Sequence, residues 1–328
     1  MDQGFANWNM NDIFLTTFLT NSAALGKIML IALIAGILVR RKIFSSLDIV
    51  SISSLTVKVL LPAMIYSKIV KTLDPVAFPD WWKLPLVGIG LIAIGVIFAV
   101  IFFAKELPAK KNMLPIASMQ NAGYLALPLG QVIYPEQFDL YALYCFLIIM
   151  GLNPILWSVG KLLSTNIGEE RFSWKKIVTP PFAANILGVI TVLTGLKNYI
   201  PDFAIDVIDL TGSATVPIAN FILGAVIGSI SLRIWPSLAD VARVLSIKFL
   251  IIPALTILLM VYWNLKDSNS LLSDTILIQA ASPPATAILI QIKNYGGDEQ
   301  TAGSTMLIAY LFCLFAIPIW LAVWRTFF

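Results

Sequence analysis

Long apolar runs follow one another along almost the whole chain, and many approach the roughly 20 residues that a helix needs to span a lipid bilayer. Apolar types make up 59% of the 328 residues and charged types only 12%, whereas soluble domains carry about 25% charged residues. Backbone polar groups in lipid must be satisfied within the spanning segment, so these runs form helices. We find none of the short alternating strands of a membrane β-barrel. The pattern predicts an all-α integral membrane protein embedded in a lipid bilayer.

We predict ten transmembrane helices joined by short connections. The longest polar connection, 161–176, separates a first set of five helices (1–160) from a second set of five (177–328). The ten spans lie near residues 15–39, 49–69, 82–104, 113–134, 138–160, 177–196, 205–230, 242–263, 274–292 and 302–324.

The distribution of Lys and Arg predicts the orientation, because the cytoplasmic loops of membrane proteins carry an excess of both. With the N-terminus outside, the inner connections hold 13 of these residues and the outer connections hold 6. The count favours both termini outside and 161–176 in the cytoplasm, with the chain in the cell (inner) membrane. Most of the net charge of +4 lies in these connections, which argues against a nucleic-acid partner.

Because each half has five spans, the second half enters the membrane in the opposite direction, and two related halves form an inverted repeat. Two pairs of prolines support the relation. Pro62 and Pro217, in spans 2 and 7, are 155 residues apart, and so are Pro128 and Pro283, in spans 4 and 9. We therefore predict a 5+5 inverted repeat, with helix breaks at these four prolines and at Pro284.

Spans 4 and 9 each combine helix-breaking residues with polar side chains near mid-span. Proline removes a backbone N–H and clashes with the preceding turn, so we expect both helices to be broken and to resume after a proline. Interrupted helices at matching positions of two halves are the best sequence indicator of a transporter site, although a proline in a membrane helix often makes only a kink. The residues concerned are Gln120, Asn121, Gly123 and Pro128 in span 4, and Gln279, Ser282, Pro283 and Pro284 in span 9.

Several motifs resemble those of the auxin efflux carrier family, which includes plant auxin exporters and bacterial permeases for organic acids. They are Leu60-Leu61-Pro62-Ala63, Asn121 to Leu129, Gln279 to Pro283, Tyr295-Gly296-Gly297-Asp298 and Pro318. The resemblance covers nearly the whole chain. It implies two inverted repeats of five spans, a scaffold domain and a transport domain, with spans 4 and 9 crossing as broken helices.

In that family the asparagine of span 4 contacts the carboxylate of the substrate, and Asn121 occupies its position. Plant members also use an asparagine near the start of span 6, which is missing here, and Asn185 lies one turn later. Plant exporters also carry a long central hydrophilic loop, whereas this chain has only 161–176. The resemblance thus implies a bacterial-type carrier of small organic anions. Homodimers are known in similar carriers, and the sequence leaves the oligomeric state open.

Lys58 lies within span 2, four residues before Pro62. A lysine buried in the hydrocarbon is a functional candidate because its charge is costly there, but a lysine can also extend to the interface. Both interpretations stay open. We predict that the substrate is bound by Asn121, Gln120, Gly123, Ser282, Lys58 and Asn185, and that Gln279 holds an ion or supports the site.

The predicted function is secondary active transport of small organic anions, auxin-like or dicarboxylate, by alternating access at the crossing of spans 4 and 9. The alternative is a sodium- or proton-coupled cation carrier, since such carriers use similar broken helices. Cation carriers usually hold a carboxylate where the broken helices cross, and the sequence has none at either break. Coupling to protons, sodium or the membrane potential stays open.

We predict no enzymatic activity and expect no catalytic residue, metal or cofactor. The chain has no His, and its two cysteines, Cys145 and Cys313, lie inside apolar runs. Two such cysteines form neither a disulfide framework nor a metal site.

Overall fold

Helices form the regular structure of the computed structural model, which describes residues 9–107, 109–164, 178–230, 234–265, 269–294 and 296–328. Within this part of the chain there is no β-strand, only one isolated bridge. The helices are α1 (Met10–Arg40), α2 (Ser46–Leu55), α3 (Leu61–Thr72), α4 (Lys83–Phe103), α5 (Met113–Ser118), α6 (Ala126–Ile133), α7 (Phe138–Ser164), α8 (Pro180–Leu193), α9 (Asp202–Ser213), α10 (Thr215–Ser229), α11 (Leu238–Ser246), α12 (Ile252–Tyr262), α14 (Ser270–Ala280), α15 (Thr286–Asn294) and α16 (Glu299–Phe327).

Seven helical stretches among the described residues are long and apolar enough to cross a membrane. They confirm the prediction of an all-α membrane protein. The stretches are Met10–Arg40, Leu47–Thr72, Lys83–Glu106, Pro135–Ser164, Asp202–Ser229, Leu238–Tyr262 and Glu299–Phe327, and α8 is a shorter apolar helix. Most of the predicted central connection, 165–176, lies outside the described residues, as does Tyr295.

The two remaining predicted spans are each divided into two short helices. Residues 119–125 separate α5 from α6, and residues 281–285 separate α14 from α15. We call these segments the first break and the second break. None of these four short helices is long enough to cross a bilayer alone.

The positions of the prolines relative to the two breaks differ from our expectation. Pro128 is the third residue of α6, not the residue before it; its missing N–H falls in the first turn, where helix N–H groups have no intrahelical partner. Pro283 and Pro284 lie within the second break, and α15 begins at Thr286. The expectation that the helix resumes after a proline is therefore wrong for α6, whereas α15 begins after Pro284 with Ala285 between them.

Pro62 and Pro217 lie within the continuous helical stretches Leu47–Thr72 and Asp202–Ser229, contrary to our prediction of helix breaks there. A π-helical turn, Thr56–Leu60, joins α2 to α3, and Pro62 is the second residue of α3. Such a turn shifts the hydrogen-bond register, so the proline ring is accommodated within a continuous helix. Pro217 is the third residue of α10, and Ala214 alone separates α10 from α9.

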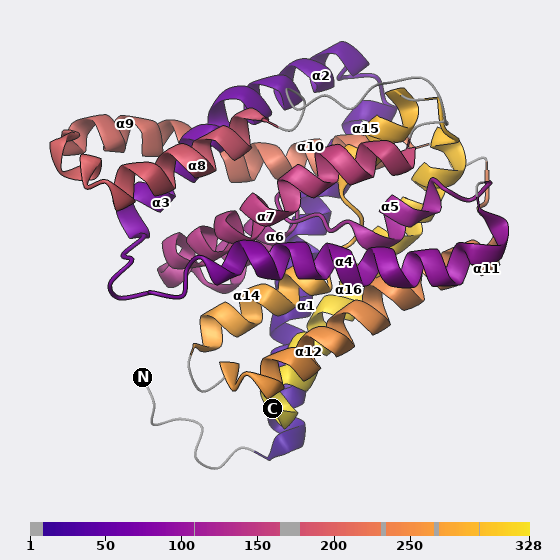
Figure 1. Cartoon of the computed structure of the whole chain (residues 1–328). Coiled ribbons are helices and arrows are strands. Elements are labelled where there is room, and N and C mark those ends of the chain that lie inside the picture. Colours follow the sequence, from indigo (N-terminus) through magenta and orange to yellow (C-terminus); the bar gives the residue numbers. More distant parts are fainter. Residues whose placement is uncertain (1–8, 108, 165–177, 231–233, 266–268, 295) are drawn as a thin grey trace.

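The helices form two groups on either side of α6 and α7 (Figure 1). One group contains α2, α3, α8, α9 and α10, in which α3 packs against α8 and α9; the other contains α4, α5, α11, α12, α14 and α16. The two groups are linked by α1, which packs against both α10 and α16. The breaks lie between the groups.

Small residues allow α1 and α10 to approach closely, as is common where membrane helices pack. A Cβ atom added to Gly224 would lie 2.1 Å from the carbonyl oxygen of Ala32, and one added to Gly228 would lie 2.5 Å from the Cα of Gly36. Larger side chains at these two positions would force the helices apart.

Candidate functional site

The two breaks pair with each other through their backbones. The N–H of Asn121 donates to the carbonyl oxygen of Pro283 at 2.8 Å, and the N–H of Ala285 donates to that of Met119 at 3.0 Å. Gln120 and Pro284 thus form an isolated antiparallel bridge. Non-helical backbone inside a membrane protein must find hydrogen-bond partners in this way. Each break therefore supplies partners for some of the backbone N–H and C=O groups of the other.

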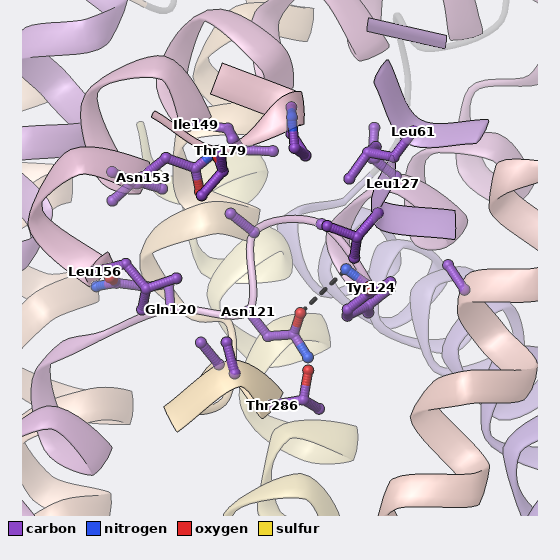
Figure 2. Close-up of a pocket in the computed structure, with 18 of the residues that line it drawn as sticks. Leu61, Gln120, Asn121, Tyr124, Leu127, Ile149, Asn153, Leu156, Thr179 and Thr286 are labelled. Carbon is purple, nitrogen blue, oxygen red and sulfur yellow. Dashed lines mark hydrogen bonds between the residues drawn. The ribbon is translucent and has the colours of Figure 1, made fainter. Parts of the chain in front are cut away.

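Asn121 lies at the centre of this contact and is almost fully buried, with 3% of its surface exposed. Its Nδ2 donates to the hydroxyl oxygen of Tyr310 at 2.5 Å, and its Oδ1 accepts from the N–H of Tyr124 at 3.0 Å, the bond drawn in Figure 2. The Tyr310 hydroxyl donates to the carbonyl oxygen of Pro284 at 2.7 Å. The side chain of Asn121 therefore connects the first break to α16 and, through it, to the second break.

Tyr310 is a site residue that the sequence analysis missed. A tyrosine in the middle of an apolar span is the available signal, because membrane tyrosines usually lie at the interfaces. Tyr310 occupies the middle third of α16 and is buried.

Gln279 supports the first break from α14. Its Nε2 donates to the carbonyl oxygen of Ala122 at 3.3 Å and contacts the Sγ of Cys145 at 3.4 Å. The Oγ of Ser282, in contrast, donates to the carbonyl oxygen of Ile278 in the preceding helix α14, at 2.7 Å. Neither side chain lines the cavity described next.

A cavity of about 230 Å³ lies beside the first break (Figure 2). Its wall also includes residues of α2, α7, α8, α10 and α15, and most of it is apolar. Among the described residues, none that lines the cavity carries a formal charge. Its polar side chains are Ser53, Gln120, Asn121, Tyr124, Asn153, Thr179, Thr215 and Thr286. The cavity can accept a small molecule with an apolar body and a few hydrogen-bonding groups.

Gln120 differs from its neighbour Asn121. It is 5% exposed and lines the cavity, yet neither atom of its amide has a hydrogen-bond partner among the described residues. A buried amide without a partner is costly, so Gln120 is the side chain of the first break with the most unused hydrogen-bonding capacity.

The structure brings together three of the predicted substrate-binding residues and leaves three apart. Gln120, Asn121 and Gly123 line the cavity, whereas Ser282, Lys58 and Asn185 do not. Lys58 is exposed on the π-helical turn before α3. Asn185 is fully buried in α8, where its Nδ2 donates to the carbonyl oxygen of Pro181 at 3.3 Å.

Four helix ends meet at the breaks. α6 and α15 begin there and α5 and α14 end there. Each helix N-terminus carries roughly half a positive charge and each C-terminus roughly half a negative charge. The helix ends alone therefore favour neither an anion nor a cation.

Ion pairs lie away from the cavity, near one end of the helices that form its wall. Lys68 Nζ lies 2.8 Å from a carboxylate oxygen of Asp139 and 3.0 Å from one of Asp209. Lys71 also binds Asp209, at 2.9 Å. The cavity-lining Leu61 precedes Lys68 by seven residues along α3, or about 10 Å at the rise of an α-helix. These ion pairs connect α3 to α7 and α9.

Two comparisons with known proteins agree with this architecture. The chain matches the model of a family described as "Membrane transport protein" over residues 21–171 and 165–321. It is also 25% identical over 283 residues to an uncharacterized transporter of Methanocaldococcus jannaschii, an alignment that covers 82% of this chain and 87% of that relative. The family match spans most of the chain and includes both breaks, and it confirms the resemblance inferred from the motifs. This chain belongs to the membrane transport protein family, that of the auxin efflux carriers.

Proposed function

We propose that the protein is a secondary active transporter of small organic anions and that the substrate binds in the cavity beside the first break. The observation that carries the proposal is the position of Asn121. Its amide lines a cavity at the point where two interrupted helices meet. Paired interrupted helices form the binding sites of many secondary transporters.

The proposed architecture is a 5+5 inverted repeat of ten transmembrane helices, with halves 1–160 and 177–328 and the connection 161–176 between them. In this proposal the ten spans are the seven long apolar helices, the shorter α8 and the two interrupted helices. The common offset of 155 residues between the proline pairs supports the relation of the halves. With both termini outside the cell membrane, the cavity lies nearer the cytoplasmic side, and the conformation is inward-facing.

Side-chain chemistry favours an anion over a cation. The amides of Gln120 and Asn121 and the hydroxyl of Thr286 can donate hydrogen bonds to a carboxylate, and the N-termini of α6 and α15 add to the attraction. A cation site would be expected to hold a carboxylate, and no acidic residue lines the cavity in the part of the chain that the structure describes. Transport then requires the cavity to open alternately to the two sides of the membrane as the helix groups move.

The test is uptake of labelled organic acids into proteoliposomes, with proton, sodium and voltage gradients imposed separately. We expect Asn121→Ala to weaken binding about tenfold or more, because a hydrogen bond to a charged group contributes roughly 1.5–3 kcal/mol. Asn121→Asp should bind more weakly still, because its carboxylate would repel the anion. The matched control is Asn21→Ala, which removes a buried amide that donates to the carbonyl oxygen of Thr17 in its own helix.

Two results would contradict the proposal. Unchanged affinity in both Asn121 variants would remove this residue from the site. Binding of sodium by the purified protein, with no response to any organic acid, would favour the cation carrier.

A further inference from the structure

The hydroxyl of Tyr310 joins the two breaks at one atom. It receives a hydrogen bond from Asn121 in the first break and donates one to the carbonyl oxygen of Pro284 in the second. The residue is 2% exposed, and it reaches the breaks from α16, far away in the sequence. A hydroxyl has one proton and can donate only one bond, so the direction of each bond matters.

The directions of these bonds follow from the chemistry of the partners. The carbonyl oxygen of Pro284 can only accept, so the Tyr310 hydroxyl must donate to it and must accept from Asn121. The backbone N–H of Tyr124 can only donate, so the atom of Asn121 that faces it must be Oδ1. The two ends of the amide are difficult to distinguish by shape alone, and here both neighbours require the same orientation.

We propose that Tyr310 is a positioning residue that fixes the amide of Asn121 with its N–H group available to the substrate. This inference rests on the proposed function. One N–H of Nδ2 is used by Tyr310, and the second remains for a carboxylate oxygen. In the reversed orientation, Oδ1 would take the place of Nδ2 and would repel an anion.

The same hydroxyl adds one hydrogen bond to the backbone pairing of the breaks. Without it, the carbonyl oxygen of Pro284 loses a donor in a buried place, although the backbone bonds of Asn121 and Ala285 remain. We therefore expect the loss of the hydroxyl to affect the orientation of Asn121 more than the fold.

The experiment is a double-mutant cycle on substrate affinity in the full chain. Tyr310→Phe removes one oxygen and keeps the ring. Since it frees Asn121 to rotate, we expect it to weaken binding of the transported organic acid about tenfold. Adding Tyr310→Phe to Asn121→Ala should produce no further weakening, because Tyr310 acts through Asn121.

The matched control is Tyr141→Phe. Tyr141 is also fully buried and donates its hydroxyl to a backbone carbonyl, that of Ala126 at the start of α6, but it does not contact Asn121. We expect this variant to keep wild-type affinity, even if its thermal stability falls. If Tyr310→Phe does not fold, Tyr310→Met, which also lacks the hydroxyl, takes its place in the cycle.

The outcomes separate this inference from the proposed function. Wild-type affinity in Tyr310→Phe, or additive effects of the two substitutions, would overturn the positioning role while Asn121→Ala still weakens binding. Wild-type affinity in Asn121→Ala would instead overturn the proposed function.

Discussion

Of the seven residues between α5 and α6, six line the cavity, whereas of the five between α14 and α15 only Ala285 does. The first break contributes amide side chains to the wall. The second contributes mainly backbone: the carbonyl oxygens of Pro283 and Pro284 and the N–H of Ala285. Two segments that look equivalent in sequence therefore have different surroundings. The first is suited to recognising a ligand, and the second to holding the first in place.

This division predicts that the second break is sensitive to changes in its backbone. Ala285→Pro removes the N–H that donates to Met119. It should lower the free energy of unfolding by about 3 kcal/mol, because a buried carbonyl oxygen loses its donor and the proline ring restrains the pairing. Thermal unfolding of the detergent-purified protein measures the effect.

The control for that substitution is Thr286→Pro, one residue later. Thr286 is the first residue of α15, a position that proline favours because the N–H there has no partner in the helix. A change of less than about 1 kcal/mol is expected. If Ala285→Pro and Thr286→Pro are destabilised equally, the hydrogen bond between Ala285 and Met119 does not stabilise the second break.

The sequence predicted the existence of the breaks better than their surroundings. Asn121 and the prolines are visible because helix-breaking and polar residues stand out in an apolar span. The partners of Asn121 could not be predicted, because Tyr310 and Pro284 reach it only through tertiary packing. Most of the predicted spans appear as helices because apolar length alone determines them.

Lys58 illustrates why side-chain placement could not be read from the sequence. Its distance from Pro62 is compatible with either face of the helix. Lys58 lies within the π-helical turn Thr56–Leu60, which departs from the regular period of an α-helix, and its side chain is exposed there. A period of 3.6 residues, applied to the sequence, cannot anticipate such a turn.

A second comparison uses the two glutamines, one from each interrupted helix. Gln279→Leu removes the bond to Ala122 and should lower the free energy of unfolding by about 1–2 kcal/mol. Gln120→Leu removes an amide without a partner among the described residues, so its stability should be unchanged or higher. Its affinity for the substrate should fall, since the amide lines the cavity. Thermal unfolding and substrate binding of both variants test these expectations. If Gln120→Leu were less stable than Gln279→Leu, the division of roles between the two breaks would be contradicted.

The smallest effect on stability is expected for Gly123→Ala in the first break. A Cβ atom built on Gly123 meets no atom within 4 Å, and the residue is not among the glycines with positive φ. The fold therefore has room for the methyl group, and the loss of backbone freedom in the unfolded chain should raise stability by about 0.4–1 kcal/mol. Because Gly123 lines the cavity, the methyl group should reduce the space for the substrate and affect bulky acids more than small ones.

Gly95→Ala is the contrasting variant. Its Cβ would lie 2.6 Å from the Cα of Ser118, at the end of α5, and overpacking there should cost about 1–3 kcal/mol. A Gly123→Ala protein with lower stability and an unchanged preference among acids of different size would show that this glycine serves the fold and not the cavity.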